Sequence, residues 1–212
     1  MNPYYPIFLN INGRKCVVIG GGQVALRKVK ALLEHGADIW VISPDICPEL
    51  SDLANSNKLQ VSRRDYRTGD LEGSFLALVA TSDHDINNKV SEEAKEKKVL
   101  VNVVDDPDIS DFIVPSNVCR GDVNIAISTG GKSPALARKI RTRLEEDFDD
   151  EYASLALLIE EVRTEVKRQG IEVNGDDWQK AIDLDVMIDL LKQDKGEKAK
   201  AVLLNNLKSS QK

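Results

Sequence analysis

The sequence is poor in the residues that crosslink small proteins or bind metals in them. Among 212 residues there are three cysteines, Cys16, Cys47 and Cys119, and two histidines. The cysteines are odd in number and far apart, and no C-x-x-C pair occurs, so neither a disulfide framework nor a zinc site is indicated. His35 falls at the end of a predicted helix and His84 in an acidic loop. We therefore expect both to be solvated, and we predict no metal site.

Long apolar runs are also missing. No stretch approaches the roughly 20 apolar residues that a membrane-spanning helix needs. The N-terminus has neither the basic region nor the apolar core of a signal peptide. We therefore expect a cytoplasmic protein without membrane association. With 42% hydrophobic and 30% charged residues, the chain is long enough for one sizeable core and an appendage.

Acidic charge is scarce in one part of an otherwise acidic chain. The net charge is −6, yet residues 145–212 alone contain 17 acidic and 10 basic residues. Residues 115–144 contain six basic residues and a single acid, Asp122. A small basic patch of this kind indicates a specific anionic ligand more than nucleic acid, which needs a larger basic face. The six are Arg120, Lys132, Arg138, Lys139, Arg141 and Arg143.

Buried apolar runs alternate with amphipathic segments in the first half of the chain. This order is typical of an α/β protein with a doubly wound parallel sheet, and we predict a Rossmann-like domain over residues 1–113. Strands are predicted at 15–19, 39–42, 59–63, 75–80 and 99–104, and helices at 24–35, 47–56 and 85–97. Gly36 has the position of a residue that ends a helix.

The second half follows a different pattern. One more strand is predicted at 124–128, and Ser133-Pro134 is a strong helix start, with Ser as N-cap and Pro in the first helical position. We assign residues 114–150 to a separate segment. Residues 151–212 have helical spacing, broken at Gly170 and at Asn174-Gly175, and form a predicted helical C-terminal domain.

A glycine-rich turn joins the first strand to the first helix. Gly20-x-Gly22-x-x-Ala25 fits the dinucleotide-binding fingerprint that ends in alanine. Gly20 permits the tight turn, Gly22 lets the backbone approach a pyrophosphate, and Ala25 allows close helix packing. The N–H groups that open the helix then face the phosphates. The alternative is a glycine-rich turn without a ligand.

The second strand is followed by Ser43-Pro44-Asp45. An acid about 20 residues after the fingerprint usually binds the ribose hydroxyls of NAD. Asp45 could take this part, or it could cap the helix that begins near Cys47. The sequence therefore favours NAD over NADP only modestly.

Two further motifs carry polar groups. Asn102–Asp105 ends a buried strand, at the sheet edge where ligands bind, and Asp105 is a candidate acid or base. The alternative is that Asp105, Asp106 and Asp108 only cap a turn. Ser128-Thr-Gly-Gly-Lys-Ser133 precedes a helix and could hold an anion. Its spacing differs from a P-loop, and the alternative is a loop with a capped helix.

Taken together and in order, six motifs resemble the precorrin-2 dehydrogenase family, the N-terminal module of siroheme synthase. The resemblance covers about residues 4–145. It rests on Tyr5-Pro-Ile-Phe-Leu, Val18-Ile-Gly-Gly-Gly-Gln-Val-Ala-Leu-Arg-Lys, Ala80-Thr-Ser-Asp, Asn102-Val-Val-Asp, Asp111-Phe-Ile-Val-Pro-Ser and Ser128-Thr-Gly-Gly-Lys-Ser-Pro-Ala-Leu-Ala-Arg.

The resemblance implies oxidation of precorrin-2 to sirohydrochlorin with NAD⁺ as hydride acceptor. It also implies a homodimer that pairs through about residues 115–144. The family's functional aspartate falls on Asp105, where it could accept a proton or orient a pyrrole N–H. A serine that is modified in one member falls on Thr129. Some members also insert iron into sirohydrochlorin, and the sequence leaves this activity open.

The resemblance and the motifs together define two sets of site residues. The expected cofactor contacts are Gly20, Gly22, Gln23, Val24, Pro44, Asp45 and Thr81. The expected contacts to the substrate, a tetrapyrrole with many carboxylates, are Asn102, Ser116, Arg120, Ser128, Thr129, Lys132, Arg138 and Arg141. A competing hypothesis is a non-catalytic, NAD-sensing regulatory module, and the Asn102–Asp105 and Ser128–Pro134 motifs speak against it.

Overall fold

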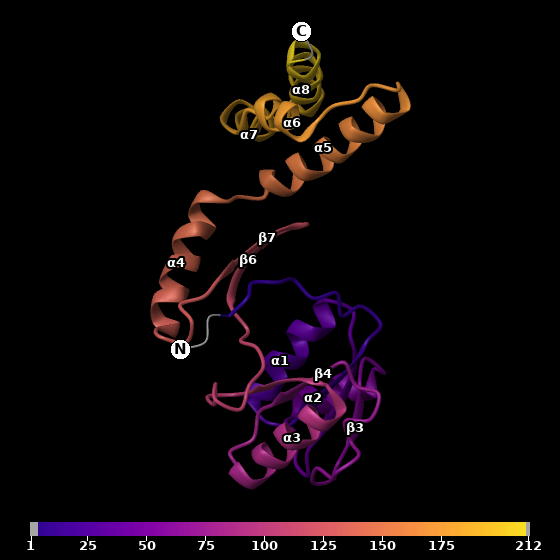
Figure 1. Cartoon of the computed structure of the whole chain (residues 1–212), viewed down its shortest axis with the longest axis vertical. Coiled ribbons are helices and arrows are strands. Elements are labelled where there is room, and N and C mark those ends of the chain that lie inside the picture. Colours follow the sequence, from indigo (N-terminus) through magenta and orange to yellow (C-terminus); the bar gives the residue numbers. More distant parts are fainter. Residues whose placement is uncertain (1–3, 211–212) are drawn as a thin grey trace. The chain divides into compact units, whose positions relative to one another are not determined.

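In the computed structural model, which describes residues 4–210, the chain divides into two units, residues 1–114 and 115–212 (Figure 1). The first unit contains a five-stranded parallel sheet with the order β3-β2-β1-β4-β5. The order reverses between β1 and β4, and ligands bind at the carboxyl ends of strands beside such a reversal. The strands are β1 (Lys15–Ile19), β2 (Asp38–Ile42), β3 (Gln60–Ser62), β4 (Leu76–Val79) and β5 (Leu100–Val103).

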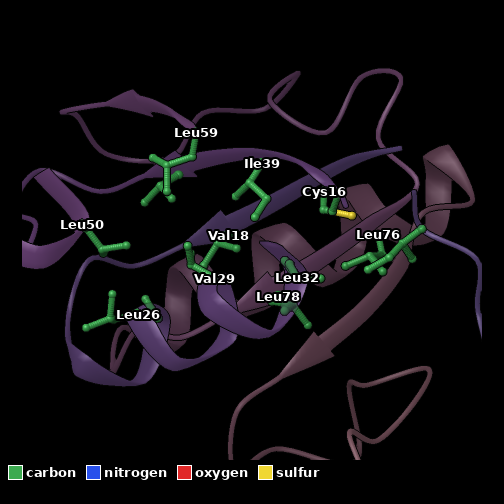
Figure 2. Close-up of a cluster of buried hydrophobic side chains, with 14 residues drawn as sticks. Cys16, Val18, Leu26, Val29, Leu32, Ile39, Leu50, Leu59, Leu76 and Leu78 are labelled. Carbon is green, nitrogen blue, oxygen red and sulfur yellow. The ribbon is translucent and has the colours of Figure 1, made fainter. Parts of the chain in front are cut away.

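Helices cover both faces of this sheet. Successive side chains of β1 point to opposite faces. Val18 packs in the cluster that contains Val29 of α1 (Gln23–Glu34), as Figure 2 shows. Val17 packs in the other cluster, with Val90 of α3 (His84–Lys97). Helix α2 (Pro48–Asn55) places Leu50 in the first cluster. The predicted Rossmann-like fold is confirmed, and each predicted element of this unit lies within two residues of the observed one.

A buried carboxylate anchors the long connection between β3 and β4. Glu93 of α3 accepts hydrogen bonds from the backbone N–H of Gly69 at 3.0 Å and of Leu71 at 3.2 Å. The Tyr66 hydroxyl also donates to it. Burial, and then this bond to a carboxylate, raise the pKa of Tyr66 far above its ordinary value. The connection is therefore tied to α3 rather than free in solvent.

The second unit begins with an antiparallel pair, β6 (Ser116–Arg120) and β7 (Val123–Ile127). Strand β6 was not predicted, because Val118 is its only buried residue and the rest of its sequence is polar. Five helices follow: α4 (Pro134–Asp147), α5 (Glu151–Arg168), α6 (Gly175–Ala181), α7 (Leu184–Lys192) and α8 (Gly196–Ser210).

Local sequence signals set several of these helix ends. Ser133 caps α4 by accepting a hydrogen bond from the Leu136 N–H, as predicted. Asn174 caps α6, and α5 ends two residues before Gly170, so both predicted breaks are confirmed. Helices α5 to α8 share one core, in which Val162, Met187 and Leu203 are fully buried. The division of this unit into residues 114–150 and 151–212 stays a prediction.

Replacing Glu93 by alanine should destabilise the first unit. The buried Leu71 N–H loses its acceptor, which costs about 1–3 kcal/mol. Urea unfolding can be followed through Trp40 in a Trp178→Phe background, since these tryptophans lie one in each unit. Glu92→Ala, at the exposed neighbouring position, is the matched control. Equal free energies of unfolding for the two variants would contradict the anchoring role of Glu93.

Candidate dinucleotide and substrate site

The glycine turn is held by direct contacts with the ends of the neighbouring strands. Gly20 has a φ of +120°, and a Cβ there would lie 2.4 Å from the carbonyl oxygen of Ala80, just after β4. A Cβ on Gly21 would lie 1.9 Å from the carbonyl oxygen of Asp45, just after β2. Both positions therefore exclude a side chain. No role was predicted for Gly21, although the triple glycine could have indicated one.

Gly22 differs from its two neighbours, because a Cβ there would meet no atom within 4 Å. It is the N-cap of α1, and no side chain caps this helix. The N–H groups of the first turn are thus free to bind an anion in the open space before the helix. Ala25 is fully buried, as the fingerprint requires. These features fit the pyrophosphate of a dinucleotide.

Asp45 is placed where a ribose contact is expected. It is exposed in the loop after β2, and its carboxylate has no partner within residues 4–210. Helix α2 begins after Cys47 without any side-chain cap, so the alternative role of Asp45 as a helix cap is wrong. Pro44 beside it is also exposed. The Ser43 hydroxyl donates to the Asp45 carbonyl at 2.7 Å and shapes this loop.

The other predicted cofactor contacts surround the same turn. Gln23 and Val24 form the start of α1, where Gln23 is exposed and Val24 half-buried. Thr81 follows β4, next to the Ala80 carbonyl that Gly20 touches. The Thr81 hydroxyl accepts a hydrogen bond from the Asp83 N–H at 3.1 Å. The structure therefore brings these contacts together with Pro44 and Asp45 at the carboxyl ends of β1, β2 and β4.

Asp105 lies in the turn after β5 and takes no part in capping it. Asp106 caps this turn by accepting from the Asp108 N–H at 3.3 Å, and Asp111 ties the end of the loop to β5 by accepting from the Val101 N–H at 3.0 Å. Asp105 is exposed, has a φ of +62°, and forms no hydrogen bond within residues 4–210. Its carboxylate is thus available to a ligand. The turn-capping alternative is correct for Asp106 and wrong for Asp105.

Asn102 precedes this turn on β5. Its side chain is buried, and its amide nitrogen donates to the Phe112 carbonyl at 3.0 Å. This bond uses one of the two amide protons and closes the loop between residues 103 and 111. The structure therefore shows a packing role for Asn102, while its predicted substrate contact is untested.

In the second unit, the predicted anion cradle is a well-bonded loop. The Ser128 hydroxyl accepts from the Gly130 N–H at 3.0 Å, and the Thr129 hydroxyl accepts from the Ser133 N–H at 2.9 Å. Both hydroxyls keep a proton that they can donate. Ser116, at the start of β6, pairs with Ile127 at the end of β7, immediately before this loop. The capped-helix alternative thus accounts for the observed bonds, and anion binding here stays a prediction.

The four basic residues that were predicted to contact the substrate fall into two groups. Arg120 lies 3.5 Å from Asp150 and Arg141 lies 3.8 Å from Glu145, so both are paired with acidic residues at the end of α4 or just after it. Arg120 also donates to the Glu145 carbonyl at 3.3 Å. The side chains of Lys132 and Arg138 are exposed and have no partner within residues 4–210. Of the four predicted contacts, these two are therefore free to meet an anionic ligand.

Three further observations narrow the choice of candidate site. In the described part of the chain, no group of three histidine, cysteine or acidic side chains could hold a metal ion. No helix within residues 4–210 is long and apolar enough to cross a membrane. A cavity of about 620 Å³ lies against α5 and α6, near Trp178, but no predicted site residue lines it. The glycine turn, which has a defined ligand geometry, remains the better candidate site.

Comparison with known proteins shows which families the chain resembles. A family described as putative NAD(P)-binding matches residues 7–116. The chain belongs to this family. A second family, described as sirohaem biosynthesis protein central, matches residues 120–146, which include β7 and most of α4.

The curated relatives agree with the resemblance seen in the sequence. Siroheme synthase of Thioalkalivibrio sulfidiphilus is 42% identical over 164 residues, which are 77% of this chain and 34% of that protein. The enzyme of Nitrosomonas europaea is 42% identical over 169 residues, or 79% and 36%. The chain thus spans about a third of the length of these relatives. Among solved structures, SirC, a precorrin-2 dehydrogenase, is similar, with a TM-score of 0.71, 25% identity, and coverage of 97% of this chain and all of that one.

Changing Gly22 to aspartate should abolish tight NAD⁺ binding and preserve the fold. Aspartate is a good N-cap residue, and the site has room for it. Its charge, however, would lie beside the pyrophosphate, and repulsion of about 4 kcal/mol at short range weakens binding by at least about 100-fold. Calorimetry measures this affinity, and circular dichroism checks the fold.

Two alanine variants separate the charge effect from the shape effect. Gly22→Ala, which adds no charge and meets no atom, should retain most of the affinity. Gly21→Ala should destabilise the protein by about 1–3 kcal/mol, because its Cβ overlaps the Asp45 carbonyl. If Gly22→Asp bound NAD⁺ like the wild type, the cofactor site would lie elsewhere.

Proposed function

We propose that this protein oxidises precorrin-2 to sirohydrochlorin with NAD⁺. The observation that carries the proposal is that two groups without bonding partners lie at the same edge of the sheet. They are the uncapped N-terminus of α1 and the carboxylate of Asp105. The register supports their proximity, since Ile19 of β1 pairs with Val79 of β4, and Val79 pairs with Val103 of β5. The names of the relatives and of SirC point to the same chemistry.

The chain supplies orientation and proton handling for this reaction. NAD⁺, when bound, accepts a hydride from a carbon of the substrate. A proton must leave the substrate at the same time, so that one new double bond forms and two hydrogens are lost. We assign the proton to Asp105, because its carboxylate is exposed and has no bond to break first. Asp45 orients the cofactor through its ribose hydroxyls.

Recognition of the substrate depends on charge. A tetrapyrrole with several carboxylates needs cations that are not already paired. Lys132 and Arg138 meet this condition, while Arg120 and Arg141 are engaged with acidic neighbours. We therefore assign the carboxylate contacts to the first two residues, together with the hydroxyls of Ser128 and Thr129. The three cysteines are free, which suits a reducing compartment such as the cytoplasm.

The direct test is incubation with precorrin-2 and NAD⁺, followed by absorbance spectroscopy. Sirohydrochlorin and NADH should appear in equal amounts. A non-catalytic NAD-sensing module would bind NAD⁺ and give neither product. Repeating the incubation with Fe²⁺ or Co²⁺ tests whether the same chain also inserts a metal ion, as its substrate, into sirohydrochlorin.

Replacing Asp105 by asparagine should lower kcat by about 10²–10⁴-fold, the usual contribution of a positioned acid or base. Asparagine also tolerates a positive φ, so the turn should keep its shape. The Kd for NAD⁺ should change little. Asp108→Asn, at an exposed position of the same loop, is the control. A near-normal kcat in Asp105→Asn would show that Asp105 is a turn residue without a catalytic role.

Reversing Lys132 and Arg138 to glutamate should raise the KM for precorrin-2 by about tenfold or more, equivalent to about 1.4 kcal/mol of lost binding. The Kd for NAD⁺ should change little. The wild-type KM should also rise with salt, because exposed charges are screened over about 8 Å at physiological ionic strength. The doubly substituted Lys180→Glu, Lys198→Glu protein has the same net charge and serves as control. A KM equal to that of this control would show that Lys132 and Arg138 have no specific role in substrate binding.

We expect the chain to form a homodimer through residues 114–150. Leu136 and Ile140 lie on one side of α4 and are 52% and 37% exposed, so this apolar surface needs cover. Light scattering should give twice the chain mass of 23.5 kDa at micromolar concentration. The Leu136→Glu, Ile140→Glu protein should be shifted toward the monomer. A wild-type monomer would disprove the expectation.

A further inference from the structure

An arginine at the end of β3 lies beside the loop that contains Asp45. The Ser43 N–H, at the start of that loop, donates to the carbonyl oxygen of Ser62 at 3.1 Å. Ser62 is the last residue of β3, and Arg63 follows it directly. The end of β3 and the loop after β2 are therefore neighbours at the carboxyl edge of the sheet.

The side chain of Arg63 is directed toward the start of α2. Its Nη2 group donates to the Ser51 hydroxyl at 3.0 Å. The Ser51 N–H donates to the Cys47 carbonyl at 3.2 Å, and the Cys47 N–H donates to the Gly21 carbonyl at 2.8 Å. A continuous series of hydrogen bonds thus connects Arg63 to the glycine turn, and Asp45 lies two residues before one member of this series, Cys47.

The guanidinium of Arg63 retains most of its hydrogen-bonding capacity. Arg63 is exposed, and within residues 4–210 its side chain uses one of its five N–H groups. Asp45 and Glu49 lie near the same helix start, but neither forms an ion pair with Arg63 in the described part of the chain. Glu49 instead accepts a hydrogen bond from Gln23 at 3.5 Å. The remaining N–H groups of Arg63 form a planar fork, which matches the oxygens of a phosphate.

We propose that Arg63 binds the 2′-phosphate of NADP⁺, so that the protein accepts NADP⁺ as well as NAD⁺. This inference rests on the proposed function, because it names a second cofactor for the same site. In a Rossmann fold, an acid near the end of the second strand binds the ribose 2′-hydroxyl of NAD⁺, whereas a nearby arginine accommodates the 2′-phosphate of NADP⁺. This chain has both groups, with Asp45 in the loop and Arg63 beside it. Asp45 repels the phosphate, and Arg63 offsets this repulsion.

The test measures the Kd values for NAD⁺ and NADP⁺ by calorimetry, without substrate. The wild type should bind NADP⁺ with a Kd within about tenfold of that for NAD⁺, because the attraction to Arg63 offsets the repulsion by Asp45. Arg63→Met should raise the Kd for NADP⁺ by about 10–100-fold, the range for losing a hydrogen bond to a charged group, and should change the Kd for NAD⁺ little. Asp45→Asn should have the opposite effect on preference, with tighter NADP⁺ binding and weaker NAD⁺ binding.

Two further variants serve as controls. Lys58→Met removes the same charge from an exposed residue just before β3, at the opposite end of that strand, and both Kd values should equal those of the wild type. Arg63→Lys retains the charge and loses the planar fork, so its Kd for NADP⁺ should lie between those of the wild type and Arg63→Met.

The outcomes separate this inference from the proposed function. A wild type that does not bind NADP⁺ overturns the inference, even if it oxidises precorrin-2 with NAD⁺. Equal weakening of both cofactors in Arg63→Met also overturns it, because the pyrophosphate and adenine are common to both. An unchanged Kd for NADP⁺ in Arg63→Met has the same consequence. If both cofactors bind as expected and precorrin-2 is oxidised with neither, the proposed function fails and the role of Arg63 stands.

Discussion

No side chain fits at Gly20 or Gly21, because the carbonyl groups that follow β4 and β2 occupy the space that a Cβ would need. This close backbone contact fixes where β1 ends and where α1 begins. It also brings the loops after β2 and β4 against the same turn. The Cys47 N–H donates to the Gly21 carbonyl at 2.8 Å and completes the connection. The candidate dinucleotide site is therefore built from backbone, and it keeps its shape because Gly20 and Gly21 have no side chains.

The sheet order then determines which side chains reach this site. Strands β1, β4 and β5 are neighbours, so residues near positions 20, 80 and 105 meet at one edge although they lie far apart in the sequence. Asp45, Thr81 and Asp105 all follow the carboxyl end of a strand. The parallel arrangement gathers these groups on the side where the helix dipole of α1 attracts anions. The proposed cofactor contacts and Asp105, the proposed proton acceptor, thus lie at one edge of the sheet.

Local patterns predicted most of the fold. The glycine turn, the Ser133 cap and the helix end at Gly36 were correct, because each depends on a few adjacent residues with strong backbone preferences. Strand β6 was missed, since a two-stranded pair with one buried residue has no strong apolar signal. The pairing of Arg141 with Glu145 has an i, i+4 spacing, which is visible in the sequence.

Tertiary contacts decided what the sequence left open about the site. Only the structure shows that Cys47 begins α2 without Asp45, or that Asp106 and Asp111 brace the loop while Asp105 does not.

Amide hydrogen exchange with and without NAD⁺ tests the central claim most directly. The account predicts protection in three separate segments, around residues 20–26, 43–47 and 80–83, because all three border the space before α1. The helices α5 to α8 should exchange as in the free protein. Protection confined to the helical core near Trp178, or no protection at the glycine turn under saturating NAD⁺, would contradict the account.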